Sequence, residues 1–255
     1  NHQGVMDTET LQEIIEKDLA ENMIPTMINA TAGTTVLGAF DPISTCADIA
    51  EKYGVWLHVD GAYCGAVLYS NKYKHLIDGV HRADSFCFNA HKMLNAPISC
   101  SIFLAKEDKM LYQSFNNEAN YLYQTHDDYF NPGKISMQCG RRNDALKLWT
   151  LWKAIGTNGL GKMIDHQFAL AKHARSYIES HPDYILYSFE NSISVCFNYK
   201  NIPANELCNQ LYQEGLLMVG YGDFRGEQFV RLVTVNAGNE VEDIEAFFNI
   251  IETML

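Results

Sequence analysis

The chain has 255 residues, 47% hydrophobic and 20% charged, which is the composition of an ordinary globular protein. Its net charge of -12 argues against nucleic acid or an anionic membrane surface as a partner, and no apolar run reaches the roughly 18 residues of a membrane span. Seven dispersed cysteines without a C-x-x-C pair favour reduced thiols in a cytoplasmic protein over disulfides or a zinc site.

The first part of the chain predicts alternating helices and strands. Asp7 is expected to cap the first helix, while Asp41 followed by Pro42 is expected to begin the second, which ends at Gly54. The strand before Asp60 is almost entirely apolar, as is typical of a central parallel strand. Strands are expected at residues 24–31, 55–60, 85–88 and 98–104.

The last of these strands follows its neighbour after a short loop, which is too short for a parallel crossover and predicts an antiparallel return. Residues 1–105 are therefore expected to form part of a doubly wound α/β sheet. A long functional or mobile loop with short helical pieces is expected over 106–140, and a helix from Asn143 that breaks at Gly156 and Gly159.

The C-terminal third predicts an α+β arrangement. Strands are expected at residues 192–199, 216–220 and 229–235, and a helix over 204–214. A last helix is expected to open at Asn239, with Glu242 completing a capping box.

Lys92 follows the apolar strand around Phe86, at the place where open α/β sheets bind ligands. Partial burial there would lower the pKa of its amine, and a neutral lysine is a nucleophile toward carbonyl groups. Asp60 ends the preceding strand, where a buried carboxylate needs a partner. Taken singly, Lys92 is also compatible with a solvated loop lysine, and Asp60 with a helix cap or a partner for a loop arginine.

Together the two residues match the needs of pyridoxal phosphate, which takes a lysine Schiff base at one end and a carboxylate at its ring nitrogen at the other. Ala62 points the same way as Asp60 and is small enough to lie under a ring. A metal site of His58, Asp60 and His91 is the alternative, but no further cluster with ligand spacing supports it. No G-x-G-x-x-G or Walker sequence predicts a nucleotide site.

Motifs along the whole chain resemble those of the group II pyridoxal-phosphate-dependent amino-acid decarboxylases, most closely the glutamate decarboxylase and cysteine sulfinate decarboxylase branch. The likeness extends from about residue 7 to the C-terminus. The motifs, in matched order, are residues 29–42 (NATAGTTVLGAFDP), 56–62 (WLHVDGA), 82–85 (RADS), 91–92 (HK), 100–101 (CS), 121–124 (YLYQ) and 138–142 (QCGRR).

The resemblance implies a role for each matched residue around the cofactor. Lys92 would carry pyridoxal phosphate as a Schiff base, and His91 would help to hold it. Asp60 would pair with the ring nitrogen, Ala62 would lie against the ring face, and Thr31 would sit beside the cofactor.

Two further residues are implied for the substrate. Arg231 would bind its carboxylate through a bidentate fork, although the residues alone also allow a surface arginine on an edge strand. Tyr129 matches the tyrosine of a mobile loop that returns a proton after carbon dioxide is lost. In the family this loop reaches into the neighbouring subunit's site, so a homodimer is implied.

The implied fold is that of the aspartate aminotransferase-like (fold type I) pyridoxal-phosphate transferases: an α/β, mostly parallel sheet with helices on both faces, and a small C-terminal α+β domain. Residues 1–160 would be the C-terminal part of the large cofactor-binding domain, and residues 161–255 the small domain. The chain begins without Met, and the family's N-terminal part, which supplies the phosphate-binding loop, is expected in a separate chain or an unseen preceding segment.

The implied activity is α-decarboxylation of an acidic L-amino acid, namely glutamate, cysteine sulfinate or aspartate.

The sequence departs from the family pattern at a few positions. Gly61 and Tyr63 stand where the family has alanine and tryptophan, and Cys64 replaces a glycine. Two alternatives stay open. One is another pyridoxal-phosphate enzyme of this fold, such as a 2,4-diaminobutyrate decarboxylase or an aminotransferase, and the other is a non-catalytic half that requires a complementary N-terminal segment.

Overall fold

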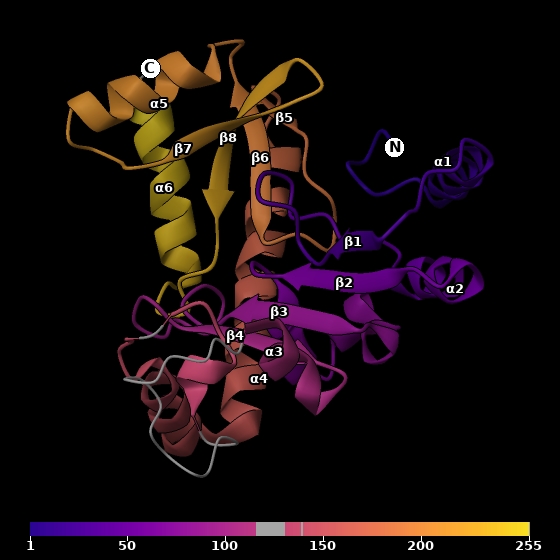
Figure 1. Ribbon diagram of the computed structural model, residues 1–255. Coiled ribbons are helices and arrows are strands. Elements are labelled where there is room, and N and C mark those ends of the chain that lie inside the picture. The colour runs from indigo at the N-terminus through magenta and orange to yellow at the C-terminus, as the bar shows by residue number, and fades with distance from the viewer. Residues whose placement is uncertain (116–130, 139, 255) are drawn as a thin grey trace.

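The computed structural model describes residues 1–115, 131–138 and 140–254, which form two four-stranded sheets connected by a long helix (Figure 1). The first sheet has the order β1-β2-β3-β4, with β4 antiparallel to β3 and the other pairs parallel. Its strands are β1 (Met27–Thr31), β2 (Trp56–Gly61), β3 (Ser85–Asn89) and β4 (Ser101–Ala105). The predicted mostly parallel sheet with an antiparallel return is confirmed.

Two helices precede β1 and β2 and begin and end near the predicted residues. They are α1 (Thr8–Ala20) and α2 (Ile43–Tyr53). Asp7 caps α1, because its carboxylate accepts the N–H of Thr10 at 3.0 Å. Gly54 ends α2 with a φ of 66°, a left-handed conformation that glycine adopts without steric cost. Between β2 and β3 the chain crosses over through short 3-10 helices at Gly65–Tyr69, Lys74–Ile77 and Val80–Arg82.

Asp41 does not cap α2 as predicted. Its two carboxylate oxygens accept the backbone N–H groups of Met6 and Thr31, each at 2.7 Å, and the helix begins at Ile43 without a side-chain cap. The carboxylate is buried, and these two distant amides satisfy it in place of the amides of its own helix. Asp41 therefore ties the segment before α1 to the end of β1.

The two faces of the first sheet differ in burial. One face carries Ile28, Leu57 and Val59, which are buried in a core cluster with residues of α2 and of the long helix α4 (Asp144–Glu179). The other face, called here the open face, is more exposed in the part of the chain that the structure describes. It carries Asn29, His58, Cys87 and Phe103.

After β4 the chain forms α3 (Asp108–Phe115), a 3-10 turn at Pro132–Lys134 and then α4. Gly156 interrupts α4 with a φ of 69° and a ψ of 173°, so the predicted break there is confirmed, whereas Gly159 is helical. The helix contributes Phe168 to the first core cluster and Leu170 to the second. Figure 1 shows it extending along both sheets.

The second sheet is entirely antiparallel and has the order β5-β6-β8-β7. Together with its two helices it matches the predicted α+β arrangement. Its elements are β5 (Tyr184–Leu186), β6 (Ser194–Tyr199), α5 (Ala204–Gln213), β7 (Gly220–Phe224), β8 (Glu227–Val233) and α6 (Val241–Met254). The strand predicted over 216–220 is wrong, because pairing with β8 begins only at Gly220. At the start of α6, Asp243 accepts the N–H of Glu240 at 2.8 Å, one residue beyond the predicted capping box.

None of the helices in the described ranges is both long and apolar enough to cross a membrane. The six cysteines that the structure describes are all free thiols.

Candidate functional site

Three predicted site residues lie at the carboxyl ends of neighbouring parallel strands. The strand register places Thr31 beside Asp60 and Asp60 beside Cys87. Lys92 follows the end of β3, where its N–H donates to the carbonyl of Asn89 at 3.1 Å and so turns the chain. Thr31, Asp60 and Lys92 therefore share one edge of the sheet, which is where α/β sheets bind ligands.

The Asp60 carboxylate is half-buried and held through one of its oxygens. Oδ1 accepts the N–H of Ala62 at 2.9 Å and the thiol of Cys87 at 3.6 Å. Among the described residues none donates to Oδ2. A carboxylate that is fixed through one oxygen and open at the other suits a cationic partner such as a ring nitrogen.

The Lys92 amine is half-buried and rises from a rigid turn. Its Nζ lies 5.9 Å from the ring centroid of Tyr63, within cation–π range. The backbone is fixed by Asn95, whose N and Nδ2 donate to the Lys92 carbonyl at 3.1 and 3.0 Å, and whose Nδ2 also reaches the carbonyl of Val235 at 2.8 Å. These hydrogen bonds therefore fix the backbone from which the Lys92 side chain extends.

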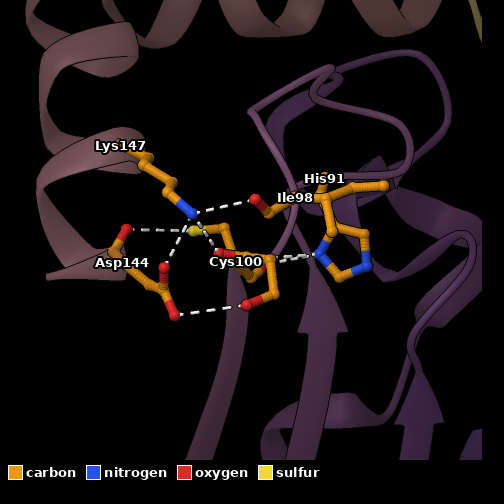
Figure 2. A network of polar contacts seen from close by, with 6 residues as sticks. His91, Ile98, Cys100, Asp144 and Lys147 are labelled. Atoms are coloured by element: carbon orange, nitrogen blue, oxygen red, sulfur yellow. Dashed lines mark hydrogen bonds and ion pairs between the residues drawn. The ribbon is translucent and has the colours of Figure 1, made fainter. Parts of the chain in front are cut away.

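His91 is fixed by the backbone of Cys100, as Figure 2 shows. Its Nδ1 lies 3.0 Å from both the N and the O of Cys100. The Cys100 thiol donates to the carbonyl of Asp144 at 3.4 Å, and Lys147 binds the carbonyl of Ile98 at 3.1 Å and the Asp144 carboxylate at 2.7 Å. The first turn of α4 thus holds the segment that orients the imidazole of His91.

The second sheet contacts the same edge at several points, and two of these contacts involve Arg231 and Tyr63. Arg231 on β8 is half-buried and donates from Nη1 to the carbonyl of Thr35, in the loop after β1. The hydroxyl of Tyr63 lies 2.8 Å from Oγ of Ser194 on β6. Burial raises the pKa of Tyr63 above its ordinary value, so this hydroxyl stays protonated at neutral pH. These contacts bring Arg231 toward the edge that carries Asp60.

The cysteine thiols near the carboxyl edge of the first sheet are not activated as nucleophiles. Burial raises the pKa of Cys64, and it raises that of Cys196 to about 12 although Arg231 opposes the shift. Burial, and then the Asp60 carboxylate, raise the pKa of Cys87. A protonated thiol is a weak nucleophile, so these residues fill space or donate hydrogen bonds.

Two further predictions concern Tyr129 and the alternative metal site. Tyr129 lies outside the described residues. The alternative metal site gains no support, because no group of three or more candidate ligands occurs within the ranges that the structure describes. His58 instead contacts Ser85 through Nδ1 at 2.7 Å and stacks on Phe103. Sequence reasoning did not assign functions to Tyr63, Ser85 and Cys87, because their contacts depend on which strands are neighbours.

A parallel sheet that presents a lysine and an aspartate at its carboxyl edge, beside an antiparallel sheet that carries an arginine, is the arrangement expected of a pyridoxal-phosphate enzyme. Comparison with known families supports this class, since residues 1–200 match the pyridoxal-dependent decarboxylase conserved domain. The chain belongs to the pyridoxal-dependent decarboxylase family. The predicted family and its cofactor are thereby confirmed.

Individual relatives agree with the predicted branch. The chain is 35% identical to human cysteine sulfinic acid decarboxylase over 100% of this chain and 56% of the relative. It is 36% identical to the glutamate decarboxylase of Drosophila melanogaster over 95% of this chain and 52% of the relative. The crystal structure of mouse CSAD in apo form matches with a TM-score of 0.92 and 34% identity, over 100% of this chain and 57% of that one. The chain thus spans about half the length of the curated relatives it matches.

Proposed function

We propose that the protein to which this chain belongs is a pyridoxal-phosphate-dependent decarboxylase that acts on an acidic L-amino acid and releases carbon dioxide and an amine. The observation that carries the proposal is the placement of Lys92 and Asp60 at the carboxyl edge of neighbouring parallel strands. The acidic substrate class is supported by the similarity to cysteine sulfinic acid and glutamate decarboxylases.

The described residues fit pyridoxal phosphate. Lys92 would hold the cofactor covalently, and Asp60 would pair with its ring nitrogen through Oδ2, the oxygen without a described partner. Ala62, which donates its N–H to Asp60, would present only a methyl group to the ring, and Thr31 and His91 would complete the contacts. Bound pyridoxal phosphate supplies the electron sink that decarboxylation requires.

Two residues are proposed to act on the substrate. Arg231 would bind the substrate carboxylate, because it is half-buried and its contact with Thr35 fixes one of its nitrogens beside the loop after β1. Tyr129, outside the described residues, would return a proton to the substrate carbon. The family resemblance implies that the loop carrying this tyrosine reaches into the neighbouring subunit's site, so a homodimer with the active site at its interface is part of the proposal.

We propose that a further, N-terminal part of the family fold covers the open face of the first sheet. Strands of parallel sheets are ordinarily covered on both faces. Here Met27 and Phe103 on that side are 57% and 49% exposed. Residues 1–160 would then complete a large cofactor-binding domain, with 161–255 as the small domain, in a cytoplasmic protein.

The substrate is identified with the full-length protein, added pyridoxal phosphate and a panel of glutamate, cysteine sulfinate, aspartate and 2,4-diaminobutyrate. We expect one acidic substrate to give stoichiometric carbon dioxide and amine. A keto-acid product would instead identify an aminotransferase. Activity restricted to 2,4-diaminobutyrate would overturn the acidic substrate class.

Attachment of the cofactor is tested with Lys92→Ala. The variant should lose both the visible absorbance of the bound cofactor and the release of carbon dioxide, because Lys92 supplies the amine that would hold the cofactor. Lys74→Ala, at an exposed lysine of the crossover, is the matched control and should keep both. A wild-type protein without visible absorbance after addition of cofactor would favour the non-catalytic alternative.

A further inference from the structure

On the open face, a series of polar side chains that alternates between β2 and β3 is connected by hydrogen bonds. Trp56, His58 and Asp60 alternate along β2 and so share one face, while Ser85 and Cys87 lie opposite them on β3. The contacts are Trp56 Nε1 to Ser85 Oγ at 2.9 Å, Ser85 Oγ to His58 Nδ1 at 2.7 Å, His58 Nε2 to Cys87 Sγ at 3.8 Å, and Cys87 Sγ to Asp60 Oδ1 at 3.6 Å.

The groups at the two ends of this series of contacts determine which atom donates in each hydrogen bond. The indole of Trp56 can only donate, and the ionised carboxylate of Asp60 can only accept. The single proton of the Cys87 thiol goes to Asp60, so His58 must donate to the sulfur from Nε2. With a neutral imidazole, His58 then accepts at Nδ1 from Ser85, whose oxygen accepts from Trp56. One arrangement of protons therefore satisfies all four contacts.

The packing holds this arrangement in place. Ser85 is only 4% exposed, so its hydroxyl has little access to water. The ring of His58 stacks on Phe103 of β4, with centroids 5.8 Å apart and planes 18° from parallel. Burial therefore protects the Ser85 hydroxyl from competing water, and stacking supports the orientation of the His58 ring.

We propose that Trp56, Ser85, His58 and Cys87 form a directional hydrogen-bond relay that positions the carboxylate of Asp60. Cys87 is the last positioning residue: it donates to Oδ1 beside the N–H of Ala62 and leaves Oδ2 for a cationic partner. The inference rests on the proposed function for the identity of that partner, the ring nitrogen of the cofactor. The geometry of the relay itself does not depend on the cofactor.

The first test uses the infrared S–H stretching band of the full-length protein prepared without cofactor. The Cys87 band is identified by its loss in Cys87→Ala. It should lie at lower frequency than the bands of the other thiols and move to higher frequency in Asp60→Asn, because a carboxylate is a stronger acceptor than an amide. A Cys87 band that stays in place in Asp60→Asn would overturn the relay.

The second test measures the dissociation constant of pyridoxal phosphate. Cys87→Ala should raise it about tenfold, as expected for loss of one hydrogen bond to a charged group, and Cys87→Ser, which restores a donor, should stay within about twofold of wild type. Cys208→Ala, at a buried thiol of α5, is the matched control and should bind like wild type. Equal effects of alanine and serine at position 87 would contradict a donor role.

A double variant tests whether His58 and Cys87 act together in one hydrogen-bond relay. His58→Phe interrupts the relay in the middle, so the variant that combines it with Cys87→Ala should bind the cofactor no more weakly than either single variant. Effects that multiply would show two independent contributions and overturn the relay. If wild type fails to bind the cofactor, the proposed function fails, whereas the S–H band still decides whether Cys87 donates to Asp60.

Discussion

The hydroxyls of Tyr63 and Ser194 meet between the two sheets with their oxygens 2.8 Å apart. Ser194 is completely buried at the start of β6, whereas Tyr63 follows the end of β2 and lies under the amine of Lys92. Together with the contact of Arg231 with Thr35, this hydrogen bond connects the sheet that carries the lysine and aspartate with the sheet that carries Arg231.

Tyr63→Phe tests this contact. The variant leaves the buried hydroxyl of Ser194 without its partner, so we expect a loss of about 1–3 kcal/mol in the free energy of unfolding, measured with urea. Combining it with Ser194→Ala removes both hydroxyls, and the double variant should lose less than the sum of the two single losses. Additive losses would mean that the two hydroxyls do not depend on each other.

Gly61→Ala is expected to destabilise the protein although the family resemblance implies alanine at this position. A Cβ at Gly61 would lie 2.6 Å from the ring of Phe86, 2.7 Å from the carbonyl oxygen of Cys87 and 2.8 Å from Cα of Gly65. Overpacking of this kind costs about 1–3 kcal/mol. Gly220→Ala, where a Cβ meets nothing within 4 Å, is the control for urea unfolding and should be close to neutral. Equal stability of the two variants would contradict the expectation.

Local patterns in the sequence predicted much of the first sheet and its edge. The apolar run before Asp60 and the short loop before β4 depend on burial and chain length, both of which can be read directly from the residues. The same patterns predicted that Asp60 and Lys92 share an edge. They did not predict Asp41 as a bridge between Met6 and Thr31, because those amides are 35 and 10 residues away.

The strand register was the main feature that the sequence left open. The apolar residues after 215 suggested a strand over 216–220, but the β7–β8 hairpin is set by its two-residue turn. Arg225 and Gly226 have φ values of 54° and 83°, as that kind of turn requires, and the pairing of Gly220 with Arg231 follows from it. The contact of Cys87 with Asp60 depends in the same way on the β2–β3 register.

The ion pair between Lys147 and Asp144 should make the free energy of unfolding depend on pH. The hydrogen bond and charge of Lys147 hold the pKa of Asp144 below the ordinary value (Figure 2). A lowered carboxyl pKa adds stability that is complete above the unfolded-state pKa of about 4 and is lost as the pH falls through the folded-state pKa. The loss of stability in Lys147→Met should therefore be larger at pH 7 than at pH 3.5, as measured by urea unfolding.

Lys162→Met provides the control for this prediction, because Lys162 is an exposed lysine further along α4. The stability difference between this variant and wild type should be the same at the two pH values. A Lys147→Met loss that does not change with pH would mean that the lysine stem or its hydrogen bonds to the carbonyls of Ile98 and Ser99, rather than the ion pair with Asp144, stabilise this region.

Arg231→Lys separates substrate binding from structure. Lysine keeps the positive charge but loses the planar fork that binds a carboxylate through two parallel hydrogen bonds, so KM for the amino-acid substrate should rise about tenfold or more. The dissociation constant of a substrate analogue in which hydrogen replaces the carboxylate should change little. Arg225→Lys, in the exposed β7–β8 turn, should leave both values unchanged.

The contact of Arg231 with Thr35 suggests an alternative, purely structural role for Arg231, and the same experiment distinguishes it from substrate binding. If the guanidinium serves only to hold the loop after β1, its loss would disturb the edge that carries Thr31 and Asp60. Binding of the analogue without a carboxylate would then weaken as much as binding of the substrate. A selective loss of carboxylate-bearing ligands is therefore the result that assigns Arg231 to the substrate.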